Sequence, residues 1–90
     1  MRFAWDDNKA AINLIKHGVS FEEATTVFGD PLSDTYPDPD HSLEEQRFVI
    51  RGLSERGKIL VVAHTDDGEI ARIISAREAT HGERKSYEEG

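Results

Sequence analysis

Three runs of β-branched and aliphatic residues, separated by two turns that end in Gly57 and Gly68, restrict the fold of this chain more than any other feature. The runs are residues 46–53, 58–65 and 69–76. Short turns with glycine in the left-handed conformation typically join antiparallel neighbours. The middle run is apolar at every position from 59 to 63, as expected for a strand covered on both faces. The sequence therefore predicts a three-stranded antiparallel meander with 58–65 at its centre.

Two short helices are predicted ahead of these strands. The carboxylate of Asp6 can accept hydrogen bonds from the next backbone amides, and apolar residues at helical spacing then favour a helix over 7–17. Ser20 and Glu23 have the spacing of a capping box, in which each side chain bonds the other residue's amide. A second helix is expected to begin there and to end at about Phe28.

The remaining segments complete an α+β fold. Residues 3–5 suit a short strand, and residues 34–40 suit an exposed edge or loop because their two prolines cannot donate in a central strand. A second capping-box pattern, Ser75 with Glu78, predicts a C-terminal helix to about Glu88. We expect a single domain, residues 1–90, with a small antiparallel sheet. The sheet would contain the meander and one or two short N-terminal or edge strands, packed by two N-terminal helices and one C-terminal helix.

Several classes of protein find no support in the sequence. There is no apolar stretch near the roughly 20 residues of a membrane span, the first residues lack a signal-peptide core, and there is no cysteine. We therefore expect a cytoplasmic protein that does not enter a membrane. Phosphate-binding glycine loops and serine-elbow motifs are absent, and the histidines lack zinc-site spacing, so neither cofactor nor metal is expected. The histidines are His17, His41, His64 and His81.

Charge is sorted along the chain although the net charge is −7. Residues 6–46 hold ten acidic side chains against two lysines, whereas residues 47–77 hold six basic side chains against four acidic ones. This separation suits a protein with one surface for a basic partner and another for an anion. It also suits an ordinary solvated acidic helix pair beside a sheet, and charge alone does not decide between the two.

Two local arginine pairs, Arg47 with Arg51 and Arg72 with Arg77, lie within or at the ends of the predicted strands. Guanidinium groups bind phosphodiesters through paired hydrogen bonds and stabilise the charge that develops during cleavage. The alternative is that each arginine pairs with a carboxylate of the acidic segment. With three-residue hairpin loops, one face of the sheet would carry Phe48, Ile50, Leu60, Val62, His64, Ile70, Arg72 and Ile74. The other face would carry Arg47, Arg51, Thr65 and Ser75. A two-residue loop would reverse this relation, so the register stays open.

Proton transfer has candidates in the first predicted helix. RNA can be cleaved without a metal when the ribose 2′-hydroxyl attacks, provided that side chains move the protons and cations hold the phosphate. Lys9 and Lys16 share one helix face, and His17 lies at the C-terminal end, where the helix dipole favours its protonated form. His17 could instead simply cap the helix. Trp5, Phe21 and Phe28 are expected in the core, with base stacking as the alternative, and His64 is expected as a half-buried strand residue.

A family resemblance extends over nearly the whole chain in the same order. The residues that carry it are Trp5-Asp6, Lys9, Asn13, Lys16-His17-Gly18-Val19-Ser20-Phe21-Glu22-Glu23-Ala24, Val27-Phe28, Asp30-Pro31, Arg72-Ile73-Ile74-Ser75-Ala76-Arg77, Ala79-Thr80, Glu83-Arg84 and Tyr87. Together they resemble the BrnT-type toxins of bacterial type II toxin-antitoxin pairs. The resemblance implies a RelE-like fold and cleavage of RNA that halts translation. It also implies a hetero-oligomer with a ribbon-helix-helix (BrnA-type) antitoxin. Operator DNA would be bound only by the antitoxin.

The combined hypothesis is a metal-independent endoribonuclease. Arg47 and Arg77 would stabilise phosphate charge, and Lys9 or His17 would transfer protons. The RNA would be steered by Arg51, Arg72 and Arg84. The rival hypothesis is a non-catalytic binding module, a co-repressor or decayed toxin that holds a basic partner through its acidic segment.

Overall fold

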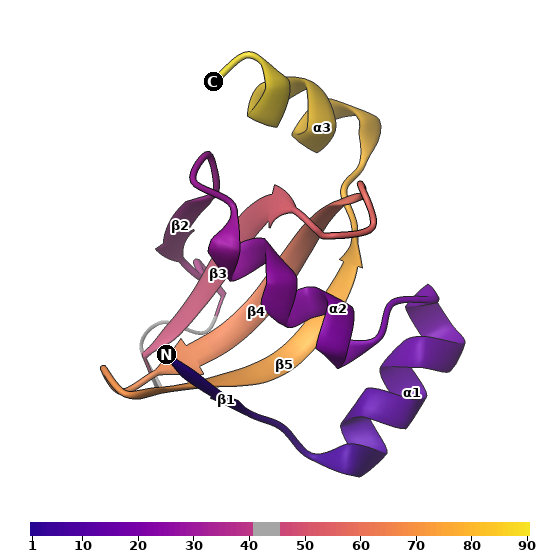
Figure 1. The fold of residues 1–90 in the computed structure, drawn as a ribbon, viewed down its shortest axis with the longest axis vertical. Coiled ribbons are helices and arrows are strands. Elements are labelled where there is room, and N and C mark those ends of the chain that lie inside the picture. The colour runs from indigo at the N-terminus through magenta and orange to yellow at the C-terminus, as the bar shows by residue number, and fades with distance from the viewer. Residues whose placement is uncertain (41–45) are drawn as a thin grey trace.

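A computed structural model describes residues 1–40 and 46–90, and in it helices pack against a five-stranded sheet (Figure 1). The elements are β1 (Arg2–Ala4), α1 (Asp7–His17), α2 (Phe21–Thr26), a 3-10 turn η1 (Val27–Gly29), β2 (Asp34–Pro37), β3 (Arg47–Leu53), β4 (Ile59–Asp66), β5 (Ile70–Glu78) and α3 (His81–Glu88). The α+β class is therefore as expected. His41 and two of the ten acidic side chains of residues 6–46, Glu44 and Glu45, lie outside the described parts of the chain.

The sheet is mixed and not purely antiparallel, which corrects the prediction. Its strand order is β1-β5-β4-β3-β2, and β1 pairs with β5 in parallel while the other neighbours are antiparallel. Parallel neighbours need a long connection, and here the whole chain from α1 to β4 lies between them. A short isolated strand such as β1 carries no sequence signal for the direction of its partner.

Local caps begin and end the N-terminal helices. Asp6 accepts hydrogen bonds from the amides of Asn8 and Lys9, and α1 ends at Gly18, which has a φ of 70°. Ser20 accepts from the amide of Glu23 at the start of α2. The carboxylate of Glu23 bonds the hydroxyl of Ser54 across the fold, so the predicted capping box is only half formed.

The beginning of the C-terminal helix differs from the prediction. β5 continues to Glu78, and α3 begins at His81 with a capping box made by Thr80 and Glu83. The expected box of Ser75 and Glu78 does not form, because β5 pairs with β4 along this stretch. A capping pattern is a local preference, and strand pairing with a distant segment overrides it.

The core lies between one face of the sheet and α2 with η1, which cross that face in Figure 1. Phe21 is fully buried, and Trp5 and Phe28 pack at the border of the core, so all three expected core aromatics belong to it. The sheet contributes Ile50, Leu60, Val62, Ile73 and Ala76. This arrangement leaves the opposite face of the sheet without α2.

His64 is buried more completely than expected, since only 2% of it is exposed. Its ring packs between Phe28 and Phe48, and neither ring nitrogen has a hydrogen-bond partner among the described residues. Burial lowers the pKa of His64 below its ordinary 6.5, against weaker opposite effects of the Thr65 backbone and the charge of Asp66.

This burial predicts a pH-dependent stability. Below pH 6.5 the imidazole of His64 binds a proton in the unfolded chain more readily than in the folded protein. The free energy of unfolding therefore has its full value above that pH and decreases as the pH falls. The slope should reach at most about 1.4 kcal/mol per pH unit. Urea unfolding between pH 5 and 7.5 measures it. His64→Leu should flatten the slope, whereas the same substitution at exposed His81 should not; equal slopes in all three proteins would contradict the prediction.

Candidate functional site

The strand register brings four arginines to the face of the sheet that lies opposite the core. Residues paired directly across neighbouring strands project to the same face. Thr65 of β4 pairs with Arg47 on one side and with Arg72 on the other. Val61 pairs with Arg51 and Arg77 in the same way. The open face therefore carries two rows that each contain two guanidinium groups.

A β-bulge in β5 makes this arrangement possible. Ala63 pairs with Ser75 but the next residue, His64, pairs with Ile73, so Ile74 is the extra residue. Arg72 and Arg77 are five positions apart and would point to opposite faces of a regular strand. The extra residue restores them to one face.

The bulge and the β4–β5 register decide the face of β5, which the sequence left open. With three-residue loops Arg72 would lie beside the core residues together with Ile70 and Ile74, but Ala71 and Ile73 occupy the core face instead. That arrangement assumed regular alternation through a three-residue hairpin loop. A single shift in pairing reverses the face of every residue on that side of it.

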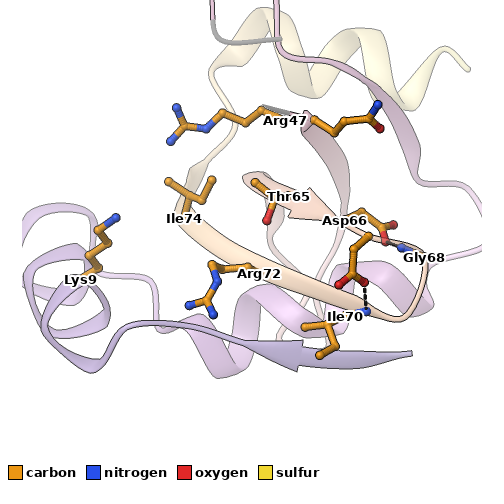
Figure 2. A pocket seen from close by; sticks show the side chains of 10 residues that line it. Lys9, Arg47, Thr65, Asp66, Gly68, Ile70, Arg72 and Ile74 are labelled. Atoms are coloured by element: carbon orange, nitrogen blue, oxygen red, sulfur yellow. Dashed lines mark hydrogen bonds between the residues drawn. The ribbon is translucent and has the colours of Figure 1, made fainter. Parts of the chain in front are cut away.

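A cavity of about 760 Å³ lies at one end of the open face. Three cations from three separate elements line it: Lys9 of α1, Arg47 of β3 and Arg72 of β5. Figure 2 shows them around the same opening, with Ile74 and Thr65 between the two arginines. The full lining is Lys9, Gln46, Arg47, Thr65, Asp66, Asp67, Gly68, Ile70, Arg72 and Ile74. We call this the basic cavity.

A second cavity of about 330 Å³ lies on the same face, and His17 and Arg77 line it. Its other lining residues are Val49, Val61, Ala63, Ser75 and Ala76. The predicted catalytic set is thus brought to one face but is divided between two hollows. Lys9 and Arg47 line the first, and His17 and Arg77 line the second.

Within residues 1–40 and 46–90, carboxylates engage Arg51 and Arg77. Arg77 donates to both oxygens of Glu83, at 2.7 and 2.9 Å, and Arg51 donates to both oxygens of Asp34, at 3.2 and 2.7 Å. The hydrogen bonds from Arg77 lower the pKa of Glu83 to about 2, so this pair persists at neutral pH. The alternative that the arginines pair with acidic side chains therefore describes Arg51 and Arg77, although Glu83 is not part of the acidic segment.

The same contacts attach α3 to the rest of the protein. Arg51 also donates to the backbone carbonyl of Glu83, and the hydroxyl of Tyr87 donates to Asp30. The hydrogen bond to Asp30 raises the pKa of Tyr87 to about 12. Arg84, expected to steer RNA, is exposed on α3 and lines neither cavity of the open face.

Asn13 is the main structural residue whose role the sequence did not reveal. It is 5% exposed, and its side-chain amide donates to the carbonyls of Val19 and Ala76 and accepts from the amide of Ala76. These bonds fasten α1 to β5 and so hold Lys9 and His17 beside the open face. A lone asparagine on the inward side of a predicted helix was the available signal.

Tyr36 also escaped the sequence analysis, because residues 34–40 were expected to be an edge or loop. In β2 it pairs with Val49, which places its ring on the open face, where 39% of it is exposed. It is an aromatic surface close to the second cavity. Such a surface is suited to stacking against a base.

Residues 1–40 and 46–90 contain neither a candidate metal site nor a candidate membrane-spanning helix. Within these ranges no group of three or more histidine or acidic side chains is placed to hold a metal ion. No helix in the same ranges has the length and apolar character needed to cross a membrane.

Comparison with known proteins identifies relatives. The sequence profile of a family described as "Ribonuclease toxin, BrnT, of type II toxin-antitoxin system" matches residues 5–83. The crystal structure of the Brucella abortus ribonuclease toxin BrnT has a similar fold, with a TM-score of 0.69 and 24% sequence identity. That match covers 90% of this chain and 99% of the other. No curated protein sequence matches the chain.

Proposed function

Since this chain belongs to the BrnT family of ribonuclease toxins of type II toxin-antitoxin systems, we propose that it is an endoribonuclease that cleaves RNA on the open face of its sheet without a metal ion. The observation that carries the proposal is the basic cavity. Lys9, Arg47 and Arg72 line it together although they are far apart in the sequence. The three cations outnumber the two carboxylates of the same lining, Asp66 and Asp67, so the opening keeps a local positive charge for a phosphate in a protein whose net charge is −7.

The reaction requires no group that the chain lacks. The ribose 2′-oxygen attacks the adjacent phosphorus, the bond to the 5′-oxygen breaks, and a 2′,3′-cyclic phosphate forms. Arg47 and Arg72 bind the non-bridging oxygens and stabilise the extra negative charge of the transition state. The 2′-hydroxyl loses a proton and the leaving 5′-oxygen gains one. Lys9 lines the basic cavity and would transfer them there, whereas His17 would do so for a phosphate bound at the second cavity.

Arg77 has a role only if a phosphate replaces Glu83 as its partner. A bidentate carboxylate and a phosphate occupy the same fork of a guanidinium group, so the two compete. We therefore assign Arg77 to the second cavity, as a group that binds an adjacent phosphate of the RNA. Arg51 and Arg84 lie outside the basic cavity and would act on the RNA through long-range attraction.

The partners follow from the same family. We propose a ribbon-helix-helix antitoxin of the BrnA type that forms a hetero-oligomer with this chain and supplies all contacts to operator DNA. The chain would act in the cytoplasm, where cleavage of RNA stops translation. The acidic side chains that follow α1 in this segment would give a separate, basic surface of the partner a complementary charge.

The test is cleavage in the presence of EDTA. The purified chain should cut RNA, with or without ribosomes, to products that end in 2′,3′-cyclic phosphate, and its expression alone should arrest growth. An excess of EDTA should leave the rate unchanged. RNA that stays intact in both mixtures, together with normal growth and retained antitoxin binding, would contradict the proposal and favour the non-catalytic binding module.

A further inference from the structure

The outward face of α1 carries the large aliphatic side chains of the helix. Ile12, Leu14 and Ile15 are 62%, 51% and 87% exposed. Figure 1 shows α1 at the side of the molecule, beyond β5, so that one side of the helix has no neighbour. Ile12 and Ile15 are three positions apart and form an exposed apolar stripe, and Leu14 lies on the other side of Ile15. We call Ile12, Leu14 and Ile15 the α1 surface.

The inward face of the same helix is made differently. Ala10 and Asn13 face the sheet, and Asn13 fastens the helix through three hydrogen bonds to backbone groups. A surface helix normally directs its large apolar residues to the core. Here polar bonds replace that packing, and the aliphatic side chains remain available to another molecule.

Basic residues border the α1 surface on one side. Lys9 precedes Ile12 by three positions and Lys16 follows it by four, so both are its neighbours on the helix surface. Lys9 also lines the basic cavity. A ligand on the α1 surface therefore meets a positive border that leads towards the RNA site, and it is complementary if it carries acidic side chains beside its apolar ones.

From these features we propose that the α1 surface binds an amphipathic, acid-bordered helix of the antitoxin. The identity of the partner rests on the proposed function, and the chemistry rests on the surface itself. Apolar residues of the partner at helical spacing would cover Ile12, Leu14 and Ile15. Its carboxylates would pair with Lys16 and Lys9, and the pairing with Lys9 would withdraw a cation from the basic cavity. Docking on α1 and inhibition of RNA cleavage would then be one event.

A second copy of this chain fits the surface poorly. An antiparallel pairing of two α1 helices about a two-fold axis brings the lysine borders together, which is repulsive. A helix of 11 residues is also only about 16 Å long, whereas a stable dimer buries about 800 Å² on each partner. An antitoxin segment can extend past the helix towards the basic cavity and gain the additional contacts.

The test measures binding to the antitoxin encoded beside this gene, by titration calorimetry and without RNA. Ile15→Glu should weaken binding about 100-fold, because it places a charge at the centre of the contact. Lys16→Glu should weaken it about tenfold. Leu32→Glu is the matched control: Leu32 is 75% exposed between η1 and β2, whereas α1 packs beside β5, so this variant should bind like the unchanged chain. RNA cleavage by Ile15→Glu should stay normal but should no longer be inhibited by the antitoxin.

Several outcomes would overturn the proposal. These are unchanged antitoxin binding by Ile15→Glu, an equal loss in Leu32→Glu, or RNA cleavage that falls with Ile15→Glu in the absence of antitoxin. A self-association of the chain that Ile15→Glu abolishes would identify a second copy as the occupant and would also overturn it. If the unchanged chain binds antitoxin through this surface but cleaves no RNA, the proposed function fails and the docking proposal stands.

Discussion

Arg72→Ala should lower the rate of RNA cleavage by about 100- to 1,000-fold, the usual effect of removing one preorganised donor to a developing charge. Arg72 lines the basic cavity with Lys9 and Arg47, and it forms no ion pair with another side chain of residues 1–40 and 46–90. The residue is exposed on β5, so the substitution should change the midpoint of thermal unfolding by no more than a few degrees. Single-turnover cleavage of a defined oligonucleotide measures the rate.

Two further variants make this prediction specific. Arg56→Ala removes the same charge from the exposed turn between β3 and β4, and it should leave the rate within about twofold. Arg72→Lys keeps the charge but loses the two-pronged donor, so it should recover only part of the activity. If Arg56→Ala and Arg72→Ala reduced cleavage equally, only the total charge of the protein would matter, and the basic cavity would not be the site.

Asn13→Ala should lower the free energy of unfolding by about 3 kcal/mol or more. The substitution leaves the amide and carbonyl of Ala76 and the carbonyl of Val19 without their partner in a buried position. Each such group costs about 1 to 3 kcal/mol, a large part of the 5 to 15 kcal/mol that typically stabilises a domain. Urea unfolding monitored by the fluorescence of Trp5 measures the loss.

Asn13→Asp tests whether hydrogen bonding or shape is responsible. Aspartate has nearly the same shape but faces the two carbonyls with acceptors only, so it should be at least as destabilising as alanine. Asn8→Ala, at an exposed position of the same helix, should cost no more than about 0.5 kcal/mol. A loss below about 1 kcal/mol for both Asn13 variants would mean that α1 is held in another way.

The consequence of Asn13 for activity follows from its place. The bond from Asn13 to β5 holds α1 in place, and α1 carries Lys9 and His17 to the open face. Asn13 therefore acts on these two residues through the position of the helix. A loosened helix would therefore reduce RNA cleavage even where the sheet and its arginines remain intact. Activity lost on Asn13→Ala at a temperature where the chain is folded is the expected sign.

Short-range interactions explain why much of the fold could be predicted. The cap at Asp6, the cap at Ser20 and the turns that end in Gly57 and Gly68 act within a few residues, and all of them appear in the structure. A hydrogen bond between a side chain and a nearby amide forms almost independently of the rest of the chain. The family resemblance adds the class of activity, and the matching family profile covers residues 5–83.

The predictions from sequence were wrong where a local conformational preference competed with pairing to a distant strand. Ser75 and Glu78 have the spacing of a capping box, yet β4 draws them into the sheet, and the box forms instead at Thr80 and Glu83. The direction of β1 was equally inaccessible, since its partner β5 lies more than sixty residues away in the sequence.

The sequence by itself determined the types of element, their approximate limits and the family, because caps, turns and apolar periodicity act between near neighbours. Only the tertiary structure decided which cations meet. The bulge at Ile74 turns Arg72 to the face of Arg47, and Asn13 brings Lys9 to the same cavity, while Glu83 engages Arg77. The physical reason is that a strand register is set by the whole sheet, and a shift of one residue moves a side chain to the opposite face.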